Sequence, residues 1–172
     1  MSKLQWIKGD ITKLNVDAIV NAANKSLLGG GGVDGAIHRA AGPQLLEECR
    51  TLGGCQTGEA KLTKGYNLPA KYVIHTVGPI ISSAVSDGKR EDLKNCYWNS
   101  LELAKKHDLK SIAFPCISTG VYSFPQDLAC DIVIDTVNDW VNKNSDHKIN
   151  VTFCLFNQED IDLYQKKLGP SA

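Results

Sequence analysis

A run of glycines followed by an acidic residue is the part of this sequence best suited to chemistry. Residues 29–38 read GGGGVDGAIH, which places Asp34 just inside the start of a predicted helix. A glycine loop that leads into a helix can bind a phosphate, because free backbone N–H groups and the positive end of the helix dipole favour an anion. A carboxylate there would repel that anion. Asp34 therefore either caps the helix in an ordinary surface turn or acts on another part of a ligand.

The glycine spacing by itself does not identify a known nucleotide-binding motif. Gly30, Gly32 and Gly35 match the dinucleotide fingerprint formally, but residues 22–29 separate them from the preceding predicted strand. No second predicted strand ends in an acidic residue about twenty positions later, as that fold requires. The P-loop pattern GxxxxGK followed by Ser or Thr is also absent. We therefore exclude a Rossmann-type dehydrogenase and a P-loop nucleotidase.

Two further segments have the composition of ligand-binding loops. Residues 21–24 (NAAN) place two amides beside residues too small to block a ligand, and residues 117–122 (ISTGVY) combine hydroxyl groups with a glycine. Both are also compatible with ordinary turns and strand-to-helix connections. Together they suit a diphosphate held mainly by backbone N–H groups, which would explain an anion site in a chain without net positive charge.

These loops lie between segments with the hydrophobic periodicity of an α/β protein. Short apolar runs predict six strands, at residues 4–8, 18–21, 60–63, 72–76, 111–115 and 150–156. Helical spacing predicts a helix after Gly32 and others at about residues 43–50, 91–107, 126–142 and 158–168. Residues 80–90 are expected to form an exposed loop. The candidate loops then follow strands, where open α/β sheets bind their ligands.

The composition is that of an ordinary globular protein, and we expect residues 1–172 to form a single domain. Its 19 basic and 19 acidic side chains balance, which argues against general binding to nucleic acids or membrane surfaces. No signal peptide or membrane-spanning segment is recognisable, so we expect a cytoplasmic protein. The six cysteines form no CxxC pair and are expected to be reduced, mostly buried thiols. No constellation suggests a metal or another cofactor.

Five motifs, in order along the chain, resemble those of the macrodomain family and of its MacroD type in particular. They are GDIT at residues 9–12, NAAN at 21–24, the glycine run and helix start at 29–37, HTVGP at 75–79 and ISTGVY at 117–122. The resemblance runs from about Leu4 to Leu168. It implies a three-layer α/β/α fold with a mixed central sheet, so at least one predicted strand should be antiparallel to its neighbours. It also implies a cleft for ADP-ribose and hydrolysis of ADP-ribose esters, namely mono-ADP-ribose on protein Asp or Glu side chains and O-acetyl-ADP-ribose.

The matched motifs imply roles for individual residues. Asn24 and Asp34 are the expected catalytic residues, with Asn24 also binding the distal ribose and Asp34 lying near the scissile ester. The other expected binding residues are Asp10 and Ile11 at the adenine, Phe156 and Asn157 beside it, and Gly32, Val33, Ser118, Thr119, Gly120, Val121 and Tyr122 around the diphosphate and distal ribose. Asp10 could instead cap a turn, Phe156 could belong to the core, and Tyr122 could pack beneath its loop.

Hydrolysis of such esters requires no nucleophilic side chain. A carboxylate leaving group departs without protonation, so an ordered water, a positioning carboxylate and electrostatic support suffice. Because a carboxylate is a weak base at neutral pH, we expect Asp34 to orient the water more than deprotonate it. The ligand diphosphate is an alternative proton acceptor.

The serine, cysteine and histidine side chains are weaker candidates for catalytic groups. A Ser or Cys hydrolase is disfavoured because no GxSxG occurs and Cys116 has no evident histidine partner. His38 is one turn beyond Asp34 and either reaches the site or lies on the helix surface. His75 is expected to be structural, whereas His107 and His147 are expected to be exposed.

Two other functions remain as alternatives. A reader module that binds ADP-ribose without hydrolysing it would share the adenine and diphosphate features, but Asn24 and Asp34 with the glycine run favour the hydrolase. An RNA-binding or poly(ADP-ribose)-binding protein has little support from the neutral charge. The expected partners are ADP-ribose, its esters and mono-ADP-ribosylated proteins.

Overall fold

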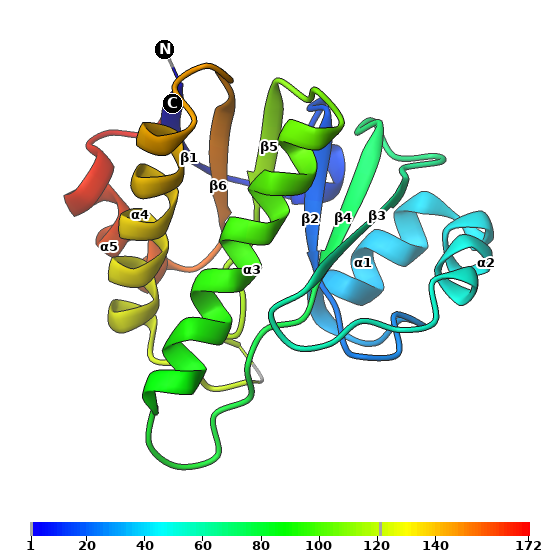
Figure 1. Cartoon of the computed structure of the whole chain (residues 1–172), viewed down its shortest axis with the longest axis horizontal. Coiled ribbons are helices and arrows are strands. Elements are labelled where there is room, and N and C mark those ends of the chain that lie inside the picture. The colour runs from blue at the N-terminus through cyan, green and yellow to red at the C-terminus, as the bar shows by residue number, and fades with distance from the viewer. Residues whose placement is uncertain (1, 121) are drawn as a thin grey trace.

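Six strands form one mixed sheet in the computed structural model, which describes residues 2–120 and 122–172 (Figure 1). The strands are β1 (Lys3–Lys8), β2 (Ala18–Ala22), β3 (Ala60–Lys64), β4 (Tyr72–Thr76), β5 (Ser111–Phe114) and β6 (Asn150–Leu155). Their order across the sheet is β1-β6-β5-β2-β4-β3. β3 is antiparallel to β4, whereas the other neighbouring pairs are parallel, so the predicted mixed sheet is confirmed.

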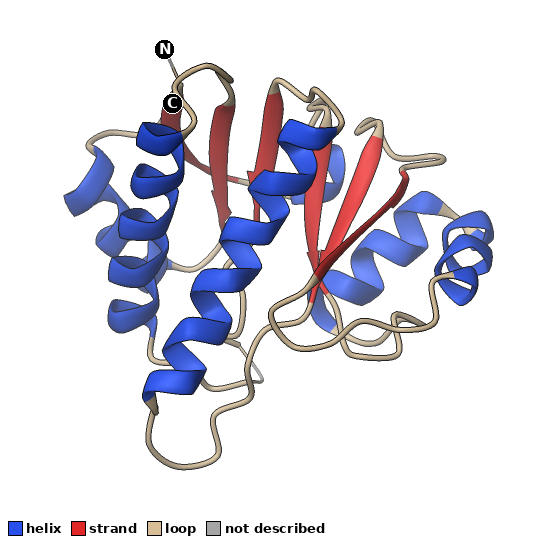
Figure 2. Ribbon diagram, in the orientation of Figure 1, coloured by secondary structure: helices blue, strands red, loops and turns tan. Residues whose placement is uncertain are grey.

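Helices cover both faces of this sheet (Figure 2). One face carries α1 (Gly32–Ala41), α2 (Pro43–Thr51) and the short 3-10 helix η1 (Ile11–Lys13), and the other carries α3 (Asp87–Lys106), α4 (Gln126–Lys143) and α5 (Gln158–Leu168). The predicted three-layer α/β/α arrangement is confirmed. The sequence patterns gave no indication of η1.

The central strands are apolar on both faces because each face is covered by helices. Successive side chains of a strand point to opposite faces of the sheet. Ile112 and Phe114 therefore belong to the hydrophobic core under α3, α4 and α5, whereas Ala113 belongs to the core under α1 and α2. Phe153 and Cys154 divide between the two cores in the same way.

Several boundaries differ from the prediction. α3 begins at Asp87 because the Ser86 side chain caps it by accepting a hydrogen bond from the Lys89 amide at 3.2 Å, so the segment expected to be a loop is helical from Asp87 on. β5 and β6 each end one residue before their predicted ends, which leaves Phe156 outside the sheet. The expectation for His147 was wrong, because its side chain is buried and its Nε2 lies 2.7 Å from the Leu109 carbonyl oxygen.

The parallel strands all direct their carboxyl ends toward the lower edge of the sheet in Figure 1. The loops that follow β1, β6, β5 and β2 meet at this edge, together with the start of α1. In the part of the chain that the structure describes, every helix is too short or too polar to span a lipid bilayer. All six cysteines are free thiols and all but Cys116 are buried, as expected.

Candidate functional site

The predicted site residues lie along one edge of the sheet, in an order set by the strands. Asp10 follows β1, Phe156 follows β6, Ser118 follows β5 and Asn24 follows β2. These four strands are consecutive neighbours in the sheet. Adjacent strands are about 4.8 Å apart, so the row of loops extends across about 14 Å. The edge therefore suits an elongated ligand that contacts different loops along its length.

One end of this row brings Asn24 and Asp34 together. A Cβ atom at Gly30 would lie 3.2 Å from Asp34 Oδ2 and 3.4 Å from Asn24 Nδ2, so both side chains face the same glycine. Asn24 also organises the loop, since its Nδ2 donates to the Gly29 carbonyl at 2.9 Å and its Oδ1 accepts from the Leu27 amide at 3.2 Å. An amide carries two N–H donors, so one remains for a ligand.

The Asp34 side chain is only 7% exposed, and its carboxylate is held by a residue that sequence reasoning did not assign to the site. Asn21 Nδ2 donates a hydrogen bond to Asp34 Oδ1 at 2.8 Å. A hydrogen bond to a carboxylate is stronger than a hydrogen bond between two neutral groups, so this contact fixes the orientation of the carboxylate. The NAAN motif contained the signal, because Asn21 lies two residues from Ile19 and therefore faces α1 with it.

His38 reaches the site, one of the two positions expected for it. Its Nε2 lies 3.4 Å from Asp34 Oδ1, one helical turn away, and its side chain is 14% exposed. The Nε2 atom is buried and makes no hydrogen bond with any described residue, so the geometry is a close approach and not a bond. The imidazole also packs beside Gly29, whose added Cβ would lie 3.8 Å from the ring.

The backbone between these loops is open to an approaching anion. Gly31 caps α1 without a side-chain hydrogen bond, and the amides of the first turn follow at Gly32 and Val33. A Cβ atom at Gly31, Gly32 or Gly120 would meet nothing within 4 Å. Unpaired helix N-terminal amides facing open space are suited to bind phosphate oxygens.

The loop after β5 has a tight conformation supported by a neighbouring motif. Ser118 has a φ of 67° and is buried, with its carbonyl accepting from the Phe124 amide at 2.8 Å. Gly78, in the HTVGP motif, lies so close that any side chain there would overlap the Ser118 hydroxyl. The partly buried Tyr122 accepts a hydrogen bond at its carbonyl from Ile81 at 2.8 Å.

Two further expected binding residues, Thr119 and Val121, belong to the same loop. The Thr119 hydroxyl lies 3.5 Å from the Cys116 carbonyl oxygen. Val121 lies outside the described residues.

The other end of the row carries the residues expected at an adenine. Asp10 caps η1, with Oδ1 accepting from the Thr12 hydroxyl at 2.7 Å and the Thr12 amide at 2.9 Å. The hydrogen bond from the Thr12 hydroxyl is the main cause of a lowered pKa of Asp10, and the hydrogen bond from the Thr12 amide adds to it. The neighbouring Ile11 is buried, whereas Phe156 is 76% exposed and thus not part of the core. Asn157 caps α5 by accepting from the Asp160 amide at 2.9 Å.

A cysteine nucleophile and a metal site find little support in the described residues. Desolvation raises the pKa of the Cys116 thiol well above its ordinary value, and the neighbouring Asp160 carboxylate adds to the shift. A thiol in this state is a poor nucleophile. Residues 2–120 and 122–172 contain no group of three or more His, Cys, Asp or Glu side chains that could hold a metal ion.

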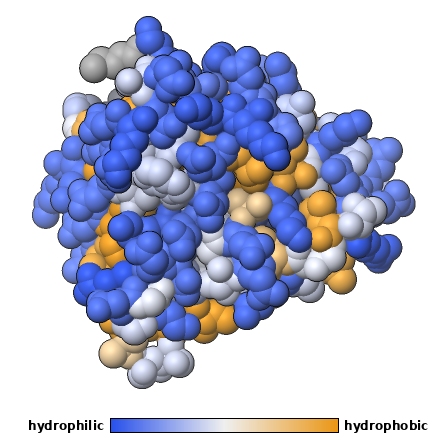
Figure 3. All heavy atoms as spheres, in the orientation of Figure 1, coloured by the Kyte–Doolittle hydropathy of each residue, from blue (hydrophilic) through white to orange (hydrophobic). Residues whose placement is uncertain are grey.

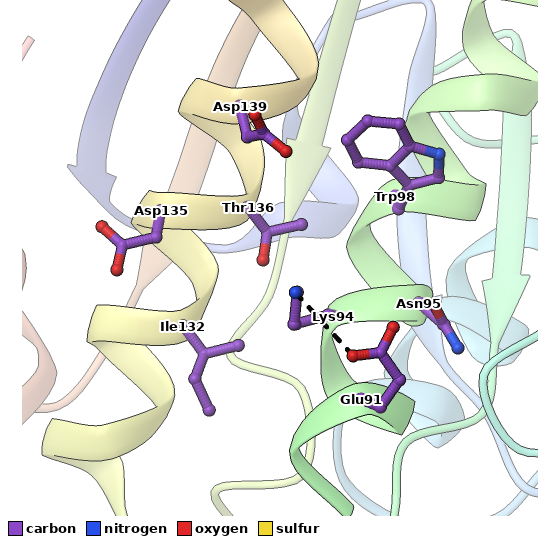
Figure 4. Close-up of a pocket in the computed structure, with 8 residues that line it drawn as sticks. All are labelled: Glu91, Lys94, Asn95, Trp98, Ile132, Asp135, Thr136 and Asp139. Atoms are coloured by element: carbon purple, nitrogen blue, oxygen red, sulfur yellow. Dashed lines mark ion pairs between the residues drawn. The ribbon is translucent and has the colours of Figure 1, made fainter. Parts of the chain in front are cut away.

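A separate groove of about 590 Å³ lies between α3 and α4 (Figure 4). It is lined by Trp98 and Ile132 together with polar and charged side chains, among them the Glu91–Lys94 ion pair at 3.8 Å. The surrounding face of the molecule is mostly hydrophilic (Figure 3). None of the predicted site residues lines this groove, so it is not the candidate site.

Known proteins resemble the chain over nearly its whole length. The Macro domain family matches residues 20–133. A macro domain-containing protein of Chlorobaculum tepidum is 60% identical, over 95% of this chain and 94% of that protein. The ADP-ribose glycohydrolase MACROD2 of Xenopus laevis is 57% identical over 97% of this chain, which spans only 40% of that relative. A Trypanosoma brucei macrodomain in complex with ADP-ribose has a TM-score of 0.90 and 46% identity, covering 96% of this chain and 69% of that one.

Proposed function

Because the chain belongs to the Macro domain family, we propose that it binds ADP-ribose at the carboxyl edge of its sheet and hydrolyses ADP-ribose esters. The proposed substrates are mono-ADP-ribose on Asp or Glu side chains of proteins and O-acetyl-ADP-ribose. A similar macrodomain is known in complex with ADP-ribose, and a similar longer protein is named an ADP-ribose glycohydrolase. The observation that carries the proposal is the buried Asp34 carboxylate, held by Asn21 at 2.8 Å beside Gly30 and Asn24.

The ligand would lie along the row of loops. Its adenine would contact Asp10 and Phe156, and its diphosphate would accept hydrogen bonds from the first-turn amides of α1 and from the loop that follows β5. The distal ribose would then reach Asn24 and Asp34. In this placement Asp34 would face the ribose and a water molecule instead of the phosphates, so its carboxylate would not repel the diphosphate.

The proposed reaction is attack by an oriented water molecule. For a protein ester, the water oxygen bonds to ribose C1, the bond from C1 to the ester oxygen breaks, and the side-chain carboxylate leaves with the bonding electrons. For the acetyl ester the water adds to the carbonyl carbon, and the ribose hydroxyl leaves with a proton. Asp34 orients the water in both cases, and the proton passes to Asp34 or to the ligand diphosphate. An N-glycosidic bond to Arg has a poorer leaving group, so we expect weak activity on it.

Replacement of Asp34 tests this proposal. We expect Asp34→Ala to lose nearly all turnover of a Glu-modified protein and of O-acetyl-ADP-ribose, because the oriented water is lost. Its dissociation constant for ADP-ribose should stay within about tenfold of the wild-type value, a window of ~1.4 kcal/mol. Turnover would be measured by product release and affinity by calorimetric titration.

The matched control is Asp139→Ala, which removes an exposed helical aspartate that pairs with Lys143 at 3.2 Å in the α3–α4 groove. This variant should keep both turnover and affinity. A wild-type chain that binds ADP-ribose but hydrolyses neither ester would be a reader module instead. A fully active Asp34→Ala variant would show that Asp34 has been assigned wrongly.

A further inference from the structure

A chain of buried polar side chains extends from Asp34 into the interior of the sheet. Asn21 on β2 and His75 on β4 are register partners, and Asn21 Nδ2 lies 3.1 Å from His75 Nδ1. On the far side of the ring, His75 Nε2 lies 2.9 Å from Thr63 Oγ1 on β3 and 3.8 Å from Cys49 Sγ on α2. Asn21, His75 and Thr63 are each fully buried.

Hydrogen-bond chemistry allows one arrangement of this chain. The Asp34 carboxylate only accepts hydrogen bonds, so Asn21 must direct its NH₂ group and not its oxygen toward Asp34. The second hydrogen of that NH₂ group points to His75 Nδ1, which must then be the unprotonated, accepting nitrogen. The ring proton is therefore on Nε2, where it is donated to Thr63 Oγ1.

This arrangement requires a neutral ring. A second ring proton would place an N–H of His75 against the N–H of Asn21, with no acceptor between them. Burial, with a smaller contribution from His38, lowers the pKa of His75 to about 3. The imidazole is therefore a permanent hydrogen-bond acceptor at neutral pH.

We propose that His75 is a positioning residue for the hydrolysis, because its Nδ1 holds the Asn21 amide in the orientation that fixes the Asp34 carboxylate. The inference rests on the proposed function. Without this acceptor the amide of Asn21 is free to rotate, and Asp34 loses the hydrogen bond that it receives from Asn21. The carboxylate can then turn toward His38 Nε2, which is already within 3.4 Å of Oδ1. Misplacement of a catalytic group by about 1 Å reduces turnover by about 100-fold.

Two substitutions separate positioning from simple support of the fold. His75→Asn keeps an acceptor near the position of Nδ1, whereas His75→Leu fills similar space without one. We expect His75→Leu to lower kcat on O-acetyl-ADP-ribose by about tenfold or more. Its dissociation constant for ADP-ribose should change by less than about threefold, because the binding loops are untouched. His75→Asn should keep kcat within about threefold of the wild type.

A second buried histidine provides the matched control. His147, near the amino ends of the strands, has its Nε2 2.7 Å from the Leu109 carbonyl oxygen and makes no contact with the site residues that the structure describes. His147→Leu should lower stability but leave kcat unchanged. Nitrogen NMR of the wild-type chain gives a readout independent of turnover, and it should show His75 in the Nε2–H form throughout pH 5.5–8.

The positioning role would be overturned if His75→Leu kept the wild-type kcat, or if His75→Asn and His75→Leu lost kcat equally. Neither result would affect the proposed function. A charged or Nδ1–H ring in the NMR spectrum would also overturn the positioning role. Absence of turnover in the wild type itself would refute the proposed function, and the role of His75 with it, before any variant is compared.

Discussion

At the scale of single residues, replacement of the exposed Phe156 side chain is the most direct test of where the adenine lies. A phenyl ring that is 76% exposed at the end of β6 contributes little to the core. We expect Phe156→Ala to weaken ADP-ribose binding about tenfold, since stacking of one base on an aromatic side chain contributes ~1–3 kcal/mol. The free energy of unfolding should change by less than about 0.5 kcal/mol. Calorimetric titration and denaturant unfolding measure the two quantities.

The conservative variant Phe156→Tyr provides the control because it keeps an aromatic face. Its affinity for ADP-ribose should equal that of the wild type. Ribose 5-phosphate, which lacks the base, should bind Phe156→Ala and the wild type equally. An unchanged affinity of Phe156→Ala for ADP-ribose would place the adenine elsewhere.

The sequence predicted the residues expected to face the ligand better than the residues that hold them in place. Asp34 and Asn24 belong to motifs that can be read along the chain, and the structure brings them to the same glycine. The contact of Asn21 with His75 depends instead on the register of β2 against β4. Hydrophobic periodicity gives the face on which a residue lies but not its partner on the next strand. His75 was therefore expected to be structural, and its link to Asp34 was not foreseen.

At the scale of elements, the packing of α1 against the glycine loop depends on the absence of a side chain at Gly35. A Cβ atom there would lie 2.5 Å from the Gly30 carbonyl oxygen and 3.0 Å from Arg39 Nη1. Gly→Ala inside a helix ordinarily stabilises it by about 1 kcal/mol. We expect Gly35→Ala to destabilise the protein by about 1–3 kcal/mol instead, because α1 must move away from the loop.

The same shift should also impair the reaction, since α1 carries Asp34. We expect Gly35→Ala to lower kcat by about tenfold or more while the protein remains folded. Gly88→Ala, in the first turn of α3, is the matched control because its nearest neighbour, Ser86 Oγ, would be 3.8 Å away. This change should stabilise the protein by about 0.4–1 kcal/mol. Equal behaviour of the two variants in denaturant unfolding would contradict the proposed contact.

At the scale of the whole molecule, the strands and helices follow from periodicity, but their spatial order does not. All six predicted strands and all five predicted helices are present, with ends shifted by up to four residues. The order β1-β6-β5-β2-β4-β3 includes long crossovers that no local pattern encodes. The resemblance to macrodomains implied at least one antiparallel strand without saying which, and the structure shows that it is β3. The sheet order is nonetheless what aligns Asp10, Phe156, Ser118 and Asn24 along one edge.

Burial of a neutral histidine on β4, between β2 and β3, makes the stability of the whole fold depend on pH. The pKa of His75 is lowered from an ordinary value of 6.5 to about 3, with burial as the main cause. The groups that face it are Asn21, Thr63 and Cys49, with His38 and Asp34 nearby on α1. Below pH 6.5 the unfolded chain binds a proton at this site and the folded chain does not. The contribution to stability is therefore complete above pH 6.5 and is lost as the pH falls toward about 3.

We accordingly expect the free energy of unfolding to fall by about 2 kcal/mol between pH 7.5 and pH 5 through His75 alone, because each pH unit below the unfolded pKa contributes ~1.4 kcal/mol. Urea unfolding of the wild type and of His75→Asn at both pH values isolates this contribution, since all other titrating groups are common to the two proteins. The wild type should lose about 2 kcal/mol more than the variant over this interval. If the stabilities of the two proteins instead fell equally between pH 7.5 and pH 5, His75 would have to become charged in the folded state. That result would contradict the neutral ring inferred from its contacts with Asn21 and Thr63.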